Sequence, residues 1–167
     1  MHSDMLSECK YSFHEAQVKL ESWCAYQDRC TFEIESKLAS WHIPVDQYDQ
    51  LINHLVQNRF LDDKRYAESF VSGKVKIKRW GRIKIKHHLI QKRLHKELIN
   101  SGLATIDSDL YWNNLIDLTN RRLKEAKKNE DKWSLRKRTA TFLASKGYEQ
   151  DLIFDAIKTC ENQSVND

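Results

Sequence analysis

The chain has 167 residues, of which 40% are hydrophobic and 31% charged, a balance that allows a folded core and argues against a disordered chain. It carries no apolar run long enough to span a membrane, and its N-terminus lacks the pattern of a signal peptide, so we expect a cytoplasmic protein without a membrane partner. With one Pro and four Gly, few positions favour helix breaks or tight hairpins, and the composition predicts an all-α fold.

The first predicted helix begins at a capping box formed by Ser12 and Glu15, which is followed by apolar residues at helical spacing. The adjacent carboxylates of Asp62 and Asp63 resemble a pair for acid–base catalysis, but a capping role before an apolar helical face is the interpretation we favour. Further helix starts are predicted at Pro44, at Asp62 or Asp63, and at Asp107 or Ser108.

The sequence repeats itself every 51 to 54 residues when Leu38, Leu89 and Leu143 are aligned. Each repeat is expected to hold one long helix followed by two short ones. Because a unit of this size buries little apolar surface by itself, we expect three tandem three-helix repeats stacked into an elongated, curved array. The expected boundaries are an N-terminal tail at 1–11, repeats at 12–60, 61–104 and 105–160, and a C-terminal tail at 161–167.

One segment has a conflicting local pattern. Residues 75–86 alternate apolar and basic side chains on both sides of Trp80 and Gly81, which is typical of a two-stranded hairpin. The repeat, however, places the corresponding positions of the first and third copies on helices. We therefore expect a helix over Arg82–Lys92, and the hairpin remains the alternative.

Positive charge is concentrated in the middle of the chain. The 28 residues from Ser69 to Lys96 contain ten Lys or Arg and no Asp or Glu, whereas the rest of the chain has 18 basic and 24 acidic residues. Such a block is typical of a surface that meets an acidic or phosphate-bearing partner, and a solvated helix face is the alternative. The candidate contact residues are Lys76, Lys78, Arg79, Trp80, Arg82, Lys84, Lys86, Arg136 and Arg138.

The candidate residues differ in what they can offer a partner. We expect the Arg residues to be the anchors, because a planar guanidinium holds a carboxylate or phosphate at two points. Trp80, like Trp41 and Trp133, either stacks on exposed bases or packs between helices, and packing is the interpretation we favour.

The sequence offers little for catalysis or metal binding. His87, His88 and His95 have no Cys or carboxylate at ligand spacing, and there is neither a GxSxG motif nor a Gly-rich phosphate loop. The four Cys form no CxxC pair, so we interpret them as small buried apolar groups. We expect no metal, no cofactor and no enzymatic activity.

Four phrases occur in order along the chain: Asp28-Arg-Cys-Thr31 with Lys37-Leu-Ala-Ser-Trp41, Phe60-Leu-Asp-Asp-Lys-Arg-Tyr-Ala67, Lys78-Arg-Trp-Gly-Arg-Ile-Lys-Ile-Lys86, and Phe142-Leu-Ala-Ser-Lys-Gly-Tyr148. In order and spacing they resemble the successive motifs of the RecX family of bacterial recombinase regulators. The resemblance covers about residues 13–158. The chain departs from the family pattern at position 93, where it has Arg and the family motif ends in Gly.

The resemblance implies tandem three-helix repeats without a catalytic site. It also implies binding along the groove of the RecA filament on single-stranded DNA, with inhibition of ATP hydrolysis and strand exchange. The expected roles are therefore in homologous recombination, DNA repair and the SOS response, and we expect a monomer. The alternative is a helical nucleic-acid-binding module that contacts DNA directly, even if weakly, through the basic middle repeat.

Overall fold

The computed structural model describes residues 9–126 and 130–163, and every regular element within them is helical. In chain order these are α1 Phe13–Tyr26, α2 Thr31–Ser40, the 3₁₀ turn η1 Val45–Gln47, α3 Tyr48–Gln57, α4 Asp63–Lys76, α5 Arg82–Gln91, α6 Lys96–Ala104, α7 Ser108–Lys124, α8 Lys132–Lys146 and α9 Gln150–Gln163. The α-helices pack in successive threes, which form unit 1 (α1–α3), unit 2 (α4–α6) and unit 3 (α7–α9).

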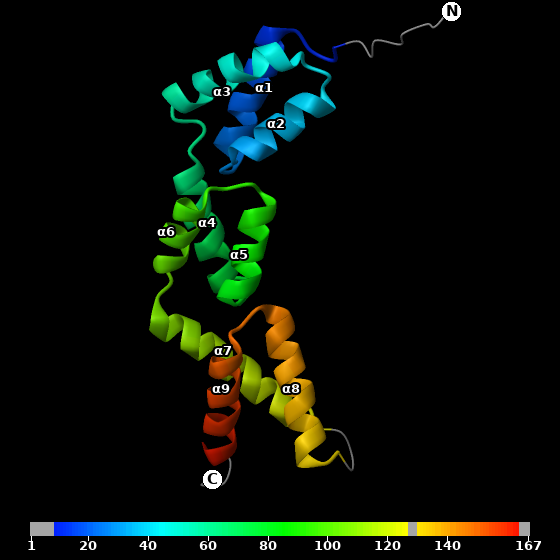
Figure 1. Cartoon of the computed structure of the whole chain (residues 1–167), viewed down its shortest axis with the longest axis vertical. Helices are drawn as coiled ribbons and strands as arrows, with labels where there is room; N and C mark the ends of the chain where they lie inside the picture. Colours follow the sequence, from blue (N-terminus) through cyan, green and yellow to red (C-terminus); the bar gives the residue numbers. More distant parts are fainter. Residues whose placement is uncertain (1–8, 127–129, 164–167) are drawn as a thin grey trace, which may run out of the picture.

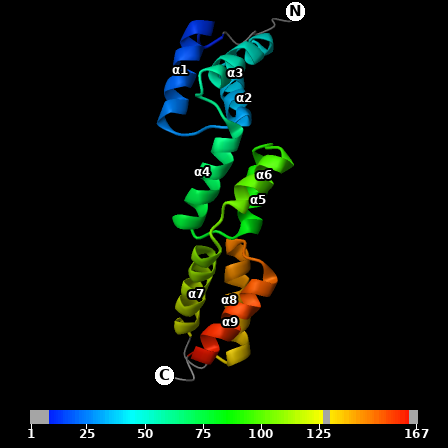
Figure 2. The same cartoon turned by 90° about the vertical axis from the view of Figure 1, so that its left-hand side faces the viewer.

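The three units lie one after another along the long axis of the molecule, with unit 1 at one end and unit 3 at the other (Figures 1 and 2). The predicted all-α fold of three-helix repeats is confirmed, while the curvature of the array stays a prediction. The expected helix lengths are wrong for unit 3, because α8 has 15 residues and α9 has 14, against 10 and 9 for α5 and α6.

The first helix of each unit begins at a side-chain cap. The Ser12–Glu15 capping box is present in full at the start of α1. Asp62 caps α4 by accepting hydrogen bonds from the backbone N–H groups of the second and third residues of the helix, and Asp107 caps α7 in the same way through Leu110 N–H at 2.7 Å. The capping interpretation of Asp62 is therefore confirmed.

The second helix of every unit ends in the same geometry. Beyond each helix a single residue adopts a left-handed backbone, with φ of 55° at His42, 56° at Arg93 and 91° at Gly147. The next N–H reaches back to the carbonyl of the aligned Leu, in the pairs Ile43 to Leu38, Leu94 to Leu89 and Tyr148 to Leu143. All three aligned Leu side chains are fully buried. Arg93 thus ends its helix as Gly147 does, despite its departure from the family pattern.

The hairpin considered for residues 75–86 is wrong. Helix α4 ends and α5 begins inside this segment. In α5 the buried side chains are Ile85 and Leu89, four residues apart, whereas Ile77 and Ile83 are 77% and 56% exposed. The alternating pattern therefore never produces one buried face, and burial at helical spacing decides the conformation.

The apolar interior consists of two clusters. Unit 1 has its own core, built from Ala16, Leu20, Cys24, Ile34, Leu38, Trp41, Ile43, Leu51, Leu55 and Leu61. Units 2 and 3 share a second core that runs from Tyr66 to Ile157 and also takes in Cys30. Because units 2 and 3 bury side chains in one cluster, we expect them to fold and move as one body.

Units 2 and 3 also meet through their backbones. Gly81 N–H donates to Lys146 O at 2.9 Å, and Ile83 N–H donates to Gly147 O at 3.0 Å. The free N–H groups at the start of α5 thereby satisfy the free carbonyls at the end of α8. A Cβ atom on Gly81 would lie 2.1 Å from the carbonyl carbon of Gly147, so this approach requires glycine.

A partly buried polar network lies at the same junction. Tyr111 Oη accepts a hydrogen bond from Arg82 N–H at 2.8 Å and donates one to Glu149 Oε2 at 2.7 Å. The Arg82 guanidinium lies 4.1 Å from the Tyr111 ring centre and binds Glu149 Oε1 at 3.2 Å. Burial, followed by the hydrogen bond to Glu149, raises the pKa of Tyr111 far above its usual value.

The junction between units 1 and 2 is more polar. Asp28 accepts hydrogen bonds from Arg65 Nε and Ser69 Oγ, both at 2.8 Å, and Lys92 Nζ lies 2.7 Å from Glu33 Oε1. Burial by itself would raise the pKa of Asp28, but the hydrogen bonds from Arg65 and Ser69 outweigh it and lower the pKa. Ion pairs therefore attach unit 1 to unit 2, alongside the apolar packing of Cys30 and Phe32 on the second core.

The cysteines are predicted to be buried, and Trp41 is predicted to pack between helices. Cys24, Cys30 and Cys160 are buried as predicted, and burial raises the pKa of Cys24 and of Cys30 to about 11. The prediction is wrong for Cys9, which is exposed because it precedes α1 and lies outside the core. Trp41 packs in the core of unit 1 against Tyr11, with ring centres 5.0 Å apart, so the packing interpretation is confirmed for this residue.

Candidate partner-binding surface

The basic block forms a cluster around Trp80, in the turn between α4 and α5. The left-handed backbone of Arg79, with φ of 51°, turns the chain, and Trp80 N–H donates to Lys74 O at 3.1 Å. The indole stacks on His88 with ring centres 4.8 Å apart, and the ammonium groups of Lys74 and Lys84 lie 5.0 and 4.8 Å from the Trp80 ring centre. We call Phe70, Lys74, Trp80, Lys84 and His88 the Trp80 cluster.

The neighbours of His88 in the Trp80 cluster affect its pKa. Burial lowers the pKa of His88, and the neighbouring charge of Lys84 acts in the same direction. His88 therefore presents a neutral ring to Trp80 at neutral pH, and the positive charge of the cluster comes from its lysines.

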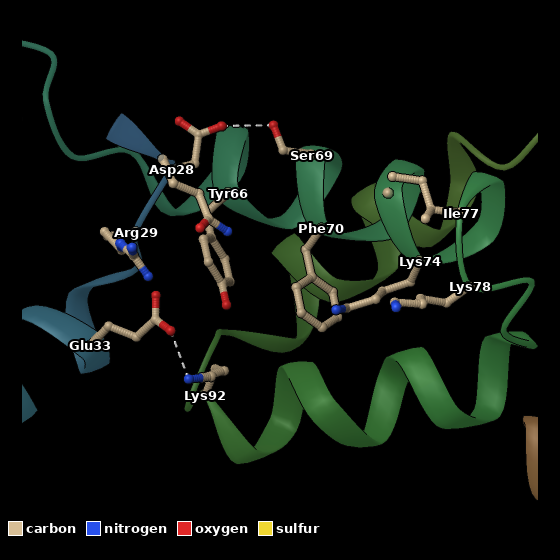
Figure 3. A pocket seen from close by; sticks show the side chains of 12 residues that line it. Asp28, Arg29, Glu33, Tyr66, Ser69, Phe70, Lys74, Ile77, Lys78 and Lys92 are labelled. Atoms are coloured by element: carbon tan, nitrogen blue, oxygen red, sulfur yellow. Dashed lines mark hydrogen bonds and ion pairs between the residues drawn. The ribbon is translucent and has the colours of Figure 1, made fainter. Parts of the chain in front are cut away.

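A cleft adjoins the cluster where unit 1 meets unit 2, with a volume of about 490 Å³ (Figure 3). Its walls come from the end of α1, the start of α2, one face of α4 and the end of α5. Phe70 lies in the middle, and Lys74 and Lys78 extend along the same side of the cleft. We call it the unit 1–2 cleft, and its lining residues are Gln27, Asp28, Arg29, Glu33, Tyr66, Ser69, Phe70, Gly73, Lys74, Ile77, Lys78 and Lys92.

The structure brings three of the candidate contact residues together. Trp80 and Lys84 belong to the Trp80 cluster, and Lys78 lines the cleft beside Lys74, which links the two regions. Lys76 lies apart, because it lines a separate hollow at the end of α6 and the start of α7. Lys86 is exposed on α5 and lines neither the cleft nor this hollow.

The four candidate Arg residues all pair with carboxylates of the same chain. Arg79 lies 3.4 Å from Asp117, Arg82 3.2 Å from Glu149, Arg136 3.0 Å from Glu161 and Arg138 2.9 Å from Glu130. A partner would have to compete with these pairs, and Arg82 is also part of the junction between units 2 and 3. The anchoring role of these Arg residues stays a prediction, and the lysines are the less engaged cations.

Unit 3 adds aromatic rings with cations above them. Trp133 is 68% exposed, so the packing interpretation is wrong for this residue, and Lys137 Nζ lies 5.1 Å from its ring centre. The reason is the length of α8: with Leu89 aligned to Leu143, the start of α5 corresponds to position 136, whereas α8 begins at residue 132. Trp133 therefore precedes the part of α8 that the repeat buries.

A shallow hollow of about 590 Å³ follows α8 from Trp133 to Ser145. It contains Phe142, whose ring centre lies 4.1 Å from the Arg122 guanidinium. At its end, Lys84 of the Trp80 cluster donates to Ser145 O at 3.1 Å. Aromatic rings and cations thus continue from unit 2 along α8.

The described part of the chain offers neither a metal-binding group of side chains nor a membrane-spanning helix. Across residues 9–126 and 130–163, no group of three His, Cys, Asp or Glu side chains is arranged to hold a metal ion. Within those same residues, no helix is both long enough and apolar enough to cross a membrane.

Comparison with known proteins places the fold in a family. Residues 62–103 match the family model for the second three-helix domain of RecX, and residues 109–157 match the model for its third three-helix domain. The chain belongs to the RecX family. The recognition made from its motifs is therefore confirmed.

Relatives named "Regulatory protein RecX" support the assignment. That of Clostridium botulinum strain Eklund 17B is 32% identical over 136 residues, which cover 81% of this chain and 63% of that protein. That of Clostridium perfringens strain 13 is 30% identical over 131 residues, or 78% of this chain and 61% of that protein. The chain thus spans about three-fifths of the length of these curated relatives.

Solved structures share the fold. The crystal structure of RecX from Lactobacillus salivarius superposes with a TM-score of 0.79 at 23% identity, covering 89% of this chain and 96% of the other. A second crystal structure, of a regulatory protein RecX, gives a TM-score of 0.78 at 20% identity and covers 88% and 73%. The three-helix repeat architecture of this RecX chain is therefore also found in solved RecX structures.

Sequence reasoning did not single out several residues of this surface in the RecX chain. Phe70 and Lys74 share one face of α4, a signal present in their spacing of four residues. Arg29 and Lys92 come from distant parts of the chain, and no local pattern places them in the cleft.

Proposed function

We propose that this chain is a non-enzymatic regulator that binds the RecA recombinase filament on single-stranded DNA and inhibits its ATP hydrolysis and strand exchange. In the cytoplasm it would thereby modulate homologous recombination and DNA repair. The observation that carries the proposal is a lysine-rich surface on unit 2 of a RecX-family chain: Lys74, Lys78 and Lys84 have no carboxylate partner within the described residues.

The shape of the molecule supports a mechanical form of inhibition. An elongated array in which units 2 and 3 share one core is suited to bridge neighbouring subunits of a filament. A bridge that binds one conformation of the filament better than another opposes the conformational cycling that ATP turnover needs. No catalytic group on this chain is required for such an effect.

The test is an ATPase assay of the cognate recombinase on single-stranded DNA, with substoichiometric amounts of this chain. We expect suppression of ATP hydrolysis, and we expect the triple variant Lys74→Gln, Lys78→Gln, Lys84→Gln to need a dose about tenfold higher or more. The matched control is Lys64→Gln, Lys96→Gln, Lys158→Gln, which removes the same charge at exposed positions outside the surface. Full turnover at equimolar wild-type protein would refute the proposal.

A second function is favoured by the aromatic rings. Trp80 and Trp133 each lie beside a lysine ammonium group, the combination used by proteins that stack on single-stranded bases. Under this alternative the chain binds DNA directly. The logarithm of its binding constant for a labelled oligonucleotide would fall steeply and linearly with the logarithm of the salt concentration, because phosphate binding releases counterions. Filament binding that persists at a salt concentration abolishing oligonucleotide binding would favour the first function.

A further inference from the structure

Gly73 is an unusual residue for its place in the fold. It lies in the interior of α4, where glycine destabilises a helix by roughly 0.5–1 kcal/mol relative to alanine. Its backbone φ is not positive, and a Cβ atom built on it would meet no atom of the described residues within 4 Å. Neither backbone conformation nor packing in the chain explains the glycine. It does leave the wall of the unit 1–2 cleft bare.

The charges of the same cleft do not balance. Its two carboxylates are engaged, Asp28 with Arg65 and Ser69, and Glu33 with Lys92. The Nε atom of Arg29 is buried and has no hydrogen-bond partner among the described residues. Its four cations are Arg29, Lys74, Lys78 and Lys92; because Lys92 is the partner of Glu33, the cations without a carboxylate partner among the described residues are Arg29, Lys74 and Lys78.

The cations are separated along the cleft. In Figure 3, Arg29 and Lys92 lie toward one end and Lys74 and Lys78 toward the other, with Phe70 between them. A ligand that fits this arrangement carries negative charge at two points and an apolar group between them. The volume of about 490 Å³ falls in the range of sites that hold a ligand of a few side chains.

We propose that the unit 1–2 cleft binds a segment of a protein partner in which acidic side chains flank an apolar one. The acidic groups pair with the cations at the two ends, and the apolar side chain packs on Phe70 against the bare wall at Gly73. The proposal rests on the proposed function, since it assigns to this chain the place where the protein partner docks. A bare polyphosphate would use the cations but would leave Phe70 without a role.

The probe is a fluorescein-labelled peptide with two glutamates on each side of a central phenylalanine, titrated with the full chain and followed by fluorescence anisotropy. Gly73→Leu extends a side chain into the open space, so we expect it to weaken binding about tenfold or more. Gly73→Ala, the matched control, should bind the peptide within about twofold of wild type and report on helix effects alone. Far-UV circular dichroism and thermal melting establish that both variants fold.

A second pair of variants tests the charges. Lys74→Gln with Lys78→Gln should weaken peptide binding about tenfold or more, whereas Lys76→Gln with Lys86→Gln removes equal charge outside the cleft and should leave it nearly unchanged. Equal losses in the two pairs, or peptide binding unaffected by a folded Gly73→Leu variant, would overturn the proposal. So would the absence of measurable peptide binding, or tighter binding of inorganic tripolyphosphate or an oligothymidine that displaces the peptide.

The recombinase ATPase assay separates this proposal from the proposed function. If Gly73→Leu abolishes peptide binding but inhibits the recombinase as wild type does, the cleft is not the docking site, and the proposed function stands. If wild-type protein binds the peptide but never affects the recombinase, the proposed function fails, and the cleft remains a site for acidic segments of another protein.

Discussion

The sharpest structural prediction uses the same chemical change at two glycines. Gly81→Ala adds a methyl group where a Cβ atom would lie 2.1 Å from the carbonyl carbon and oxygen of Gly147. Carbon atoms in contact prefer separations of about 3.5–4.0 Å, so the end of α8 must move away from the start of α5. The backbone at Gly81 has φ −78° and ψ 161°, which alanine adopts without strain, so the steric clash is the main cause of the effect.

The magnitude follows from the bonds that such a movement breaks. Two backbone hydrogen bonds, from Gly81 and Ile83 to the end of α8, would be lost, together with the bond from Tyr148 Oη to Arg79 O at 3.2 Å. At about 1 kcal/mol each, the free energy of unfolding should fall by about 2–4 kcal/mol. For a chain of this size, the melting temperature should fall by about 5–15 °C.

Gly73→Ala is the matched comparison, because a Cβ atom there meets nothing. We expect it to raise the free energy of unfolding by about 0.5–1 kcal/mol through helix propensity alone. Urea denaturation followed by far-UV circular dichroism measures both variants. If Gly81→Ala were as stable as wild type, or were stabilised as Gly73→Ala is expected to be, the close approach of α5 and α8 would be wrong.

The other predictions concern core, junction and pH. Leu38→Ala, Leu89→Ala and Leu143→Ala should each lower the free energy of unfolding by about 2–5 kcal/mol in urea titrations, and a near-zero loss at one position would break the repeat register. Arg82→Gln should lower the free energy of unfolding by about 1–2 kcal/mol, because it removes the ion pair with Glu149 and the stack on Tyr111. The control is Arg121→Gln, at an exposed position. Equal stability of the two variants would count against the junction network. Folding lowers the pKa of His88, so the unfolded chain binds the proton more readily than the folded chain. The free energy of unfolding should therefore fall as the pH drops from about 7 through the unfolded pKa near 6.5, and it should level off below the folded pKa. His88→Phe keeps a ring against Trp80 and should flatten that dependence in melts recorded across this pH range, and an unchanged slope would assign it to other groups.

Local sequence signals determined the helices and their register. Ser12 and Asp107 cap their helices through backbone N–H groups three residues away, so their role is visible in the sequence itself. The aligned Leu38, Leu89 and Leu143 are buried alike because each repeat presents the same helical face to its own neighbours. The repeat also outweighed the local alternation around Trp80, because Ile85 and Leu89 are buried four residues apart, which stabilises a helix, and the described residues contain no strand that could pair with this segment.

Tertiary structure alone decided which residues of the basic block are held in ion pairs. Arg82 meets Glu149, and Arg29 lines a cleft with Lys92, across sequence separations that no local pattern encodes. The count of charges predicted a basic surface, but only the fold separates the Arg residues held in ion pairs from Lys74, Lys78 and Lys84, which have no carboxylate partner among the described residues. The same holds for the glycines: Gly81 and Gly73 look alike in the sequence, yet one is required by a backbone 2.1 Å away and the other borders open space. The physical reason is that charge pairing and close packing depend on which distant residues the fold brings together, whereas helix formation depends on near neighbours.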